Sequence, residues 1–194
     1  MQPKTFVIAL KDHPISEQQL LDCKNSATNF GWDIETHWGV HGKTITEATW
    51  SSINVKPLVK NSSMRLPGQQ GCFLSHWNLW NKCIDIDQPI VVLEHDAIIQ
   101  DKWSDVTTSG VLVKLHANYK SHRVKTNNLT GIWTNSSHAY YIEPTSAKSI
   151  IKFAKSVGAL PVDVMLGSYV VKVAHLGLPE LVSRQNSYST THIL

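Results

Sequence analysis

The sequence predicts one α/β domain over residues 1–194, with a mainly parallel central sheet flanked by helices. Short apolar runs of strand length alternate along the chain with longer segments of helical period, which is typical of helices packed on a parallel sheet. No repeat, low-complexity tract or linker divides the 194 residues, and this length suits one well-buried core. In such folds ligands bind at the carboxyl ends of the strands, so residues there are the first functional candidates.

The N-terminal half predicts three strands and two helices. The strands are expected at residues 4–10, 33–37 and 90–94. Ser16 is a candidate N-cap for a helix that Gly31 ends. A second helix is expected over residues 69–85, after a polar and weakly patterned connection at residues 43–67.

The C-terminal half predicts further strands and one clear helix. A strand is expected at residues 111–115, then a polar loop at 116–128 and a strand pair at 129–133 and 139–143. Pro144 opens a helix that Gly158 ends. Its apolar face has helical spacing and consists of Ala147, Ile150, Ile151 and Ala154.

Composition disfavours several classes of protein. No apolar run approaches the roughly 20 residues of a membrane span, and the N-terminal run is too short for a secretory signal, so we expect a cytoplasmic location. Three cysteines without a C-x-x-C pair indicate neither a disulfide framework nor a zinc knuckle. The net charge of +3 is not concentrated in a Lys/Arg run, which disfavours a nucleic-acid arm, although a pI of about 8.7 permits a nucleic-acid partner. Nothing in the sequence indicates an oligomeric state.

An acidic step ends the apolar strand Ile90–Leu93. It reads Glu94-His95-Asp96, and apolar residues resume at Ala97. Residues i and i+2 point to the same side of an extended chain, so the carboxylates of Glu94 and Asp96 can converge. Two carboxylates at a strand end can hold a divalent cation that neutralises a diphosphate. The alternative is a pair of solvated acids in a turn, but the apolar residues on both sides favour a functional site.

The helix at residues 69–85 has a mixed face between its core stripe and its solvated side. The residues on this face are Cys72, Ser75, His76 and Leu79. Near a helix start, Ser75 and His76 are well placed to meet an anionic ligand or the acidic strand end. The alternative is that both only hydrogen-bond a neighbouring loop.

A third acid, Asp163, follows Pro161 and opens a new apolar segment. An aspartate at this position can be a simple helix N-cap. It can also be a general base that removes a proton from an acceptor hydroxyl. The residue pattern alone leaves both roles open.

Five sequence phrases together resemble glycosyltransferase family 25, the lipopolysaccharide-biosynthesis group that includes collagen galactosyltransferase domains. They are Gly68-Gln69-Gln70-Gly71-Cys72-Phe73-Leu74-Ser75-His76, Leu93-Glu94-His95-Asp96, Ala139-Tyr140-Tyr141-Ile142, Pro161-Val162-Asp163 and Pro179-Glu180-Leu181-Val182-Ser183-Arg184-Gln185. They occur in the family's order and span nearly the whole chain. The first phrase is the most specific of the five.

The resemblance implies a GT-A type, Rossmann-like fold and a glycosyltransferase. Such an enzyme would move a hexose with inversion from a nucleotide-diphosphate sugar, with a UDP-sugar favoured, to an acceptor hydroxyl. The acceptor implied by the family is a surface glycan; a hydroxylated nucleobase or a protein side chain is an alternative. Mn²⁺ or Mg²⁺ would be the cofactor. Nucleic acid is a less favoured partner.

The resemblance also assigns roles to residues. Glu94 and Asp96 would hold the metal, with His175 as a weaker third candidate. Asp163 and Asp96 would be the catalytic residues, with Asp163 as the base on the acceptor side or as a further donor contact. The donor would contact Leu10, Lys11, Gly71, Ser75, His76, Glu94 and His95.

The chain departs from the family pattern at two places. His95 replaces the middle acid of the family's acidic triplet, which lowers the negative charge of the metal site. The arginine usual after the first strand is absent, and Lys11 can supply its charge only as a point charge. Both departures favour a second hypothesis, a catalytically degenerate module that binds a sugar or nucleotide on the same fold. A histidine-rich metalloenzyme is disfavoured because no H-x-x-x-H pair occurs.

Overall fold

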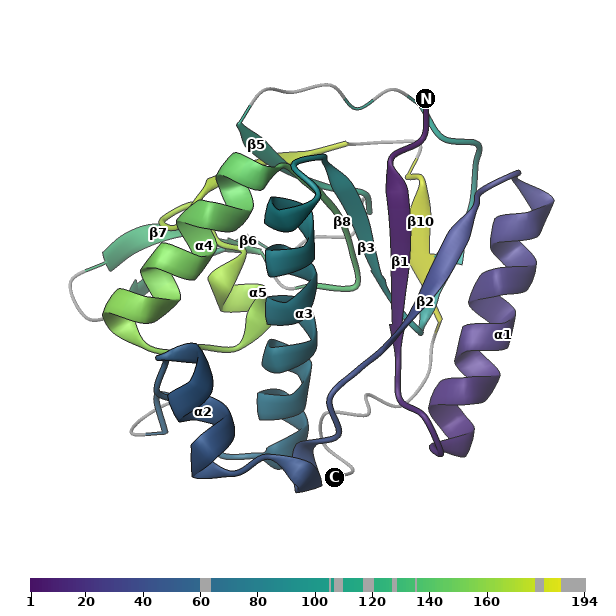
Figure 1. The fold of residues 1–194 in the computed structure, drawn as a ribbon. Coiled ribbons are helices and arrows are strands. Elements are labelled where there is room, and N and C mark those ends of the chain that lie inside the picture. The colour runs from purple at the N-terminus through teal and green to yellow at the C-terminus, as the bar shows by residue number, and fades with distance from the viewer. Residues whose placement is uncertain are drawn as a thin grey trace.

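A six-stranded sheet forms the centre of the molecule (Figure 1). The computed structural model describes residues 1–59, 64–104, 106, 110–116, 121–126, 129–134, 136–176 and 180–185. Across the sheet the strands are β2 (Ile34–Trp38), β1 (Lys4–Ala9), β3 (Ile90–Glu94), β8 (Ala139–Ile142), β5 (Val111–Lys114) and β9 (Lys172–His175). Neighbours are parallel except at β8, which runs antiparallel to both β3 and β5. The predicted α/β fold with a mainly parallel sheet is confirmed.

The strand pairing differs from the sequence prediction in the C-terminal half. The segments expected to form one pair belong to different sheets, because β8 inserts between β3 and β5. Its expected partner, β7 (Leu129–Thr134), pairs instead with β6 (Ser121–Thr126) in a separate antiparallel ribbon. The prediction of a polar loop over residues 116–128 was therefore wrong for β6, whose Ser-His-Arg-Val-Lys-Thr sequence has little apolar signal.

Alternating side chains of the strands divide the core into two layers. Phe6 and Ile8 of β1 belong to the layer covered by α3 (Pro67–Asp85) and α4 (Pro144–Val157). The short helices α2 (Glu47–Ile53) and α5 (Val162–Met165) contribute buried residues to the same layer. Val7 and Ala9 pack on the opposite face against α1 (Pro14–Asn29). That face is also covered by a two-stranded sheet of β4 (Ala97–Ile99) and β10 (Val182–Arg184). The sheet thus lies between helices on both sides.

Local details correct two helix predictions. The N-cap of α1 is His13, whose Nδ1 accepts the Ser16 N–H, because Pro14 starts the helix three residues earlier than predicted. The Ser16 hydroxyl instead accepts the backbone N–H of Leu10 at 2.8 Å. A short 3-10 helix (Gly42–Thr44) leads into the connection at residues 43–67. The connection itself contains α2, whose seven residues bury only Trp50 and so show no helical period.

The described residues contain no helix that is long and apolar enough to cross a membrane.

The start of α3 lies at the end of the sheet where β1 and β3 finish. Only residues 86–89 separate the end of α3 from the start of β3, so the helix runs back along the strand (Figure 1). Glycine allows the first turns of α3 to approach the loop after β2. A Cβ at Gly71 would lie 2.5 Å from the carbonyl oxygen of Val40, and one at Gly42 would lie 2.1 Å from that of Pro67. This contact fixes the position of the start of α3 relative to the carboxyl ends of β1 and β3.

We expect Gly71→Ala to lower the free energy of unfolding by about 1 to 2 kcal/mol, measured by urea denaturation. Overpacking costs about 1 to 3 kcal/mol, and the better helix propensity of alanine offsets up to about 1 kcal/mol of this. Asn78→Ala, on the exposed side of the same helix, is the control and should change stability by less than about 0.5 kcal/mol. A Gly71→Ala variant as stable as the control would contradict the close packing.

Candidate active site at the carboxyl end of the sheet

The carboxylate of Glu94 ends β3 on the face covered by α3. Ile90 and Val92 of the same strand belong to the core layer under α3, and alternation places Glu94 on their side. Its Oε1 accepts a hydrogen bond from Ser137 Oγ at 2.5 Å and lies 3.4 Å from His76 Nε2. Burial would raise the pKa of Glu94, but the contact with His76, the hydrogen bond from Ser137 and a nearby arginine together lower it well below its ordinary value. Glu94 is therefore ionised at neutral pH.

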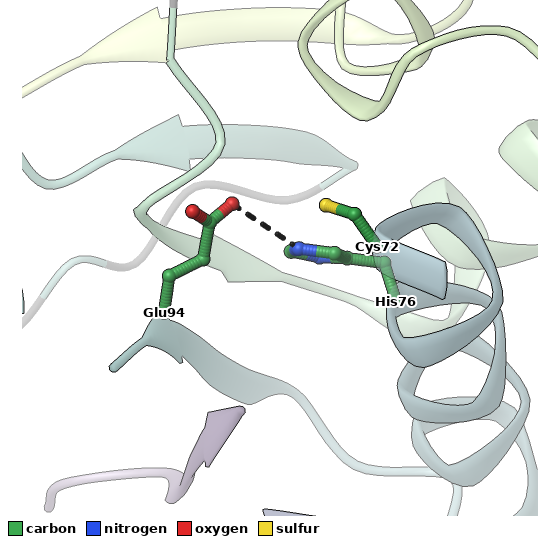
Figure 2. A group of neighbouring side chains, drawn as sticks. All are labelled: Cys72, His76 and Glu94. Carbon is green, nitrogen blue, oxygen red and sulfur yellow. Dashed lines mark ion pairs between the residues drawn. The ribbon is translucent and has the colours of Figure 1, made fainter. Parts of the chain in front are cut away.

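The ring of His76 is fixed from behind by two buried aromatic side chains. Its Nδ1 shares a hydrogen bond of 2.7 Å with the Tyr140 hydroxyl, which also accepts the indole N–H of Trp80 at 2.9 Å. The His76 and Tyr140 rings stack with centroids 5.7 Å apart. Nε2 is thereby turned toward Glu94, and the thiol of Cys72, one helical turn earlier, points toward the same space (Figure 2). The mixed face of α3 does meet the acidic strand end.

Ser75 and Gly71 hold a neighbouring loop, which is the alternative considered for this helix face. The Ser75 hydroxyl accepts the N–H of Val40 at 2.8 Å and donates to the Gly71 carbonyl at 2.7 Å. Ser75 is 1% exposed. Two of the residues predicted to contact a donor are therefore used, in this structure, to dock the loop after β2 on α3.

Asp96 lies beyond the end of β3 and has a different partner from Glu94. The strand stops at Glu94 and residues 95–96 form a turn, so the i, i+2 alternation behind the prediction does not extend to Asp96. Its Oδ2 accepts a hydrogen bond from Arg184 Nε at 2.6 Å. Burial and the charge of Glu94 raise the pKa of Asp96, against the effect of Arg184. The two carboxylates therefore interact electrostatically while each has its own cationic or histidine partner.

His95 has a partner in β1. Its ring hydrogen-bonds the backbone of Ile8 in β1, and burial lowers the pKa of His95 against the opposing effect of the two neighbouring acids. The side chain is 9% exposed. His95 is therefore held as a neutral, buried imidazole beside β1.

The sequence analysis missed Lys114, which lies fully buried at the end of β5. Its Nζ donates to the backbone carbonyl of Ser136 at 2.6 Å. Burial lowers the pKa of Lys114 to about 7, against the charges of Asp163 and Glu94. Asp163 lies in α5, where its Oδ1 accepts the N–H of the following residue at 3.0 Å. Because the charges of Asp163 and Glu94 both affect the pKa of this amine, α5 and the end of β3 border the same region as Lys114. The available signal was a lysine inside the apolar run of residues 111–115.

Three histidines gather at the neighbouring ends of β5, β8 and β9. The ring centroids of His116 and His138 are 4.4 Å apart, and those of His116 and His175 are 6.4 Å apart. Burial and the charge of His116 lower the pKa of His138 to about 3. The structure thus places His175 beside His116, and the ligand group that contains Glu94 does not include it.

The two candidates after β1 lie in the turn that leads into α1. Leu10 is 9% exposed, and its backbone N–H donates a hydrogen bond to the Ser16 hydroxyl. Lys11 is exposed and makes no ion pair with any residue that the structure describes. The positive charge that the acidic step receives comes instead from Arg184 in β10.

The family model of glycosyltransferase family 25, described as lipopolysaccharide-biosynthesis proteins, matches residues 2–166 of the 194. The chain belongs to glycosyltransferase family 25. This confirms the resemblance carried by the sequence phrases, and the protein is a glycosyltransferase. The matched span includes Cys72, His76, Glu94, Lys114 and Asp163. The GT-A type fold that the family implies agrees with the observed α/β architecture.

Two solved structures are similar in overall architecture. The galactosyltransferase LgtC, in complex with donor and acceptor sugar analogues, has a TM-score of 0.49 and 12% identity over 88% of this chain and 72% of that chain. The CTP:phosphocholine cytidylyltransferase LicC from Streptococcus pneumoniae has a TM-score of 0.42 and 11% identity over 96% and 95% of the two chains. No curated protein matches the sequence significantly. The family assignment therefore stands on the match of the sequence to the family model.

The buried lysine of this family 25 protein predicts a pH-dependent stability. The pKa of Lys114 is about 7 in the folded protein and about 10.4 in an unfolded chain. Between these values the unfolded state binds more protons, so the free energy of unfolding rises with pH by up to about 1.4 kcal/mol per unit. From pH 7 to pH 9 the wild type should gain up to about 2.5 kcal/mol relative to Lys114→Met in urea denaturation.

The exposed Lys152 of α4 provides the matched control for this measurement. Lys152→Met should follow the wild type at both pH values, because this side chain is exposed in the folded protein. Parallel pH profiles for the wild type and Lys114→Met would exclude a lysine that titrates near neutral pH.

Proposed function

We propose that this family 25 protein transfers a hexose from a nucleotide-diphosphate sugar, with a UDP-sugar favoured, to an acceptor hydroxyl with inversion. The observation that carries the proposal is the acidic step at the end of β3, where Glu94 is ionised and Asp96 keeps a buried oxygen, Oδ1, without a hydrogen-bond partner among the described residues. Family membership sets the reaction class, and the position at the carboxyl end of the sheet is the usual one for a nucleotide ligand.

Mn²⁺ or Mg²⁺ fits the oxygens that this step offers. Both contacts of Glu94 use Oε1, and within the described part of the chain its Oε2 makes no hydrogen bond. Together with Asp96 Oδ1 this gives two carboxylate oxygens, the ligand type that these hard cations prefer. A bound ion would neutralise the departing diphosphate. Arg184, whose side chain is 46% exposed, adds a guanidinium that can bind phosphate oxygens directly.

Asp163 is the residue we propose as the general base on the acceptor side. It is half-buried in α5, and its charge raises the pKa values of Lys114 and Cys72, as does the charge of Glu94. Asp163 therefore borders the region of Glu94 from a different element, α5. An inverting transfer needs a base that removes the acceptor proton as the new glycosidic bond forms. The charges of both acids raise the pKa of the buried Lys114 amine, against the larger effect of its burial.

The acceptor we propose is a surface glycan, as the family's role in lipopolysaccharide biosynthesis suggests. A hydroxylated nucleobase or a protein side chain is the alternative acceptor. A cytoplasmic location would give the enzyme access to nucleotide sugars.

One observation favours the second hypothesis, a catalytically degenerate binding module. Asp96 already has a cationic partner in Arg184, and the middle position of the acidic step is the neutral His95. The step therefore holds less net negative charge than two free carboxylates. A module of this kind would bind a nucleotide sugar without releasing the nucleotide diphosphate.

The first test is a panel of nucleotide sugars with and without Mn²⁺, followed by release of the nucleotide diphosphate. We expect turnover with a UDP-sugar, stimulation by Mn²⁺, and a loss of about 10²-fold in Asp96→Asn. This corresponds to about 2.7 kcal/mol of lost charge stabilisation at the leaving group. The exposed Asp85 lies at the far end of α3, and Asp85→Asn should keep wild-type turnover. Binding without turnover would support the module, and full activity in Asp96→Asn would remove Asp96 from the site.

The second test separates catalysis from donor binding. Asp163→Asn should lower kcat by about 10²- to 10⁴-fold, the usual contribution of a general base. The dissociation constant of the nucleotide sugar, measured by calorimetry, should stay within about twofold of the wild type. Unchanged kcat, or a loss that lies entirely in donor affinity, would contradict the role of Asp163 as base.

A further inference from the structure

Three side chains of different chemistry meet between α3 and the end of β3. One ligand atom each from Cys72, His76 and Glu94 lies within 4.8 Å of the other two. Cys72 and His76 are four residues apart on α3 and therefore lie above one another on one face of the helix. Glu94 reaches them from the strand, and all three groups point into a common space (Figure 2).

The spacing of these atoms suits a small tetrahedral ion. His76 Nε2 and Glu94 Oε1 are 3.4 Å apart. Two ligands that bind zinc at about 2.0 Å in tetrahedral geometry are about 3.3 Å apart. The backbone therefore needs little adjustment to bring both atoms within bonding distance of one ion.

The second nitrogen of His76 has the outer contact that zinc ligands typically have. Nδ1 is 2.7 Å from the Tyr140 hydroxyl. A ligand histidine usually donates its other N–H to such a partner, which fixes the ring and its tautomer. The Tyr140 oxygen has two lone pairs, so it can accept from both His76 and Trp80. His76 is 0% exposed, and this arrangement presents Nε2 to the site.

The electrostatic surroundings favour a cation at this point. Burial raises the pKa of the Cys72 thiol, and so do the negative charges of Glu94, Asp163 and Asp96. The same three charges would stabilise a divalent ion placed beside the sulfur, and such an ion would displace the thiol proton.

We propose that Cys72, His76 and Glu94 form a zinc site with three protein ligands and one open position. Thiolate and imidazole ligands select Zn²⁺ over Mn²⁺ or Mg²⁺, which prefer oxygen. The site shares Glu94 with the cation site proposed for sugar transfer, but through Oε1, whose present contacts are His76 and Ser137. It does not depend on the proposed transferase activity, since zinc binding is measured without a sugar donor.

The test uses Co²⁺ as a spectroscopic substitute for zinc in the 194-residue protein. Titration should produce a thiolate-to-cobalt charge-transfer band in the near ultraviolet that saturates at one equivalent. Zn²⁺ should suppress the band, whereas a large excess of Mg²⁺ should not. Cys72→Ser should abolish it, and Glu94→Gln should weaken the apparent cobalt affinity by at least about tenfold.

Cys83 provides the matched control on the same helix. It is a free, buried cysteine outside the ligand group, and Cys83→Ser should keep the full cobalt band. Circular dichroism of each variant verifies that it is folded. A wild type without the band, or a band that survives in Cys72→Ser, would overturn the proposal. A normal cobalt band in a protein that turns over no nucleotide sugar would instead count against the proposed function alone.

Discussion

The site depends on one ionised carboxylate, that of Glu94, being held where three elements meet. A buried charge is unfavourable unless it is paired and hydrogen-bonded. Glu94 satisfies this condition through His76 of α3 and Ser137, which precedes β8. His76 in turn relies on Tyr140 of β8. The arrangement requires α3 to run back along β3 and β8 to lie beside β3, so the sheet order and the position of α3 are both conditions for the site.

The two acids of the step illustrate how neighbouring groups acquire different properties. The pKa of Glu94 is lowered and that of Asp96 is raised, although only one residue separates them. Glu94 receives two contacts on one oxygen, whereas Asp96 has a single partner in Arg184 and a second oxygen buried without one among the described residues. Paired groups whose pKa values are driven apart commonly have distinct roles in catalysis. Here Glu94 is the acid held in its ionised form, and Asp96 is the acid whose charged form is disfavoured by burial.

Periodicity was sufficient to predict the sheet strands β1, β2 and β3, the helices α3 and α4, and the face of α3 that meets Glu94. Periodicity failed where contacts between segments distant in the sequence determine the position of a side chain. Alternation could not place Asp96, because the strand ends before it. Lys114 has the sequence context of an ordinary strand residue in an apolar run, and only the folded structure shows that its amine is fully buried and affected by the charges of Asp163 and Glu94. The contact of Arg184 with Asp96 joins positions 88 residues apart through the pairing of β10 with β4, and no local pattern specifies it.

The position of Arg184 on β10 has a consequence for how relatives of this protein are compared. The family match ends at residue 166, whereas the guanidinium that balances Asp96 is contributed by residue 184. A comparison confined to the matched span would count two acids and a neutral histidine, and would assign the acidic step one more unit of negative charge than it has with Arg184. The charge balance of this site can therefore change through a substitution in β10, without any change in the span that defines family membership.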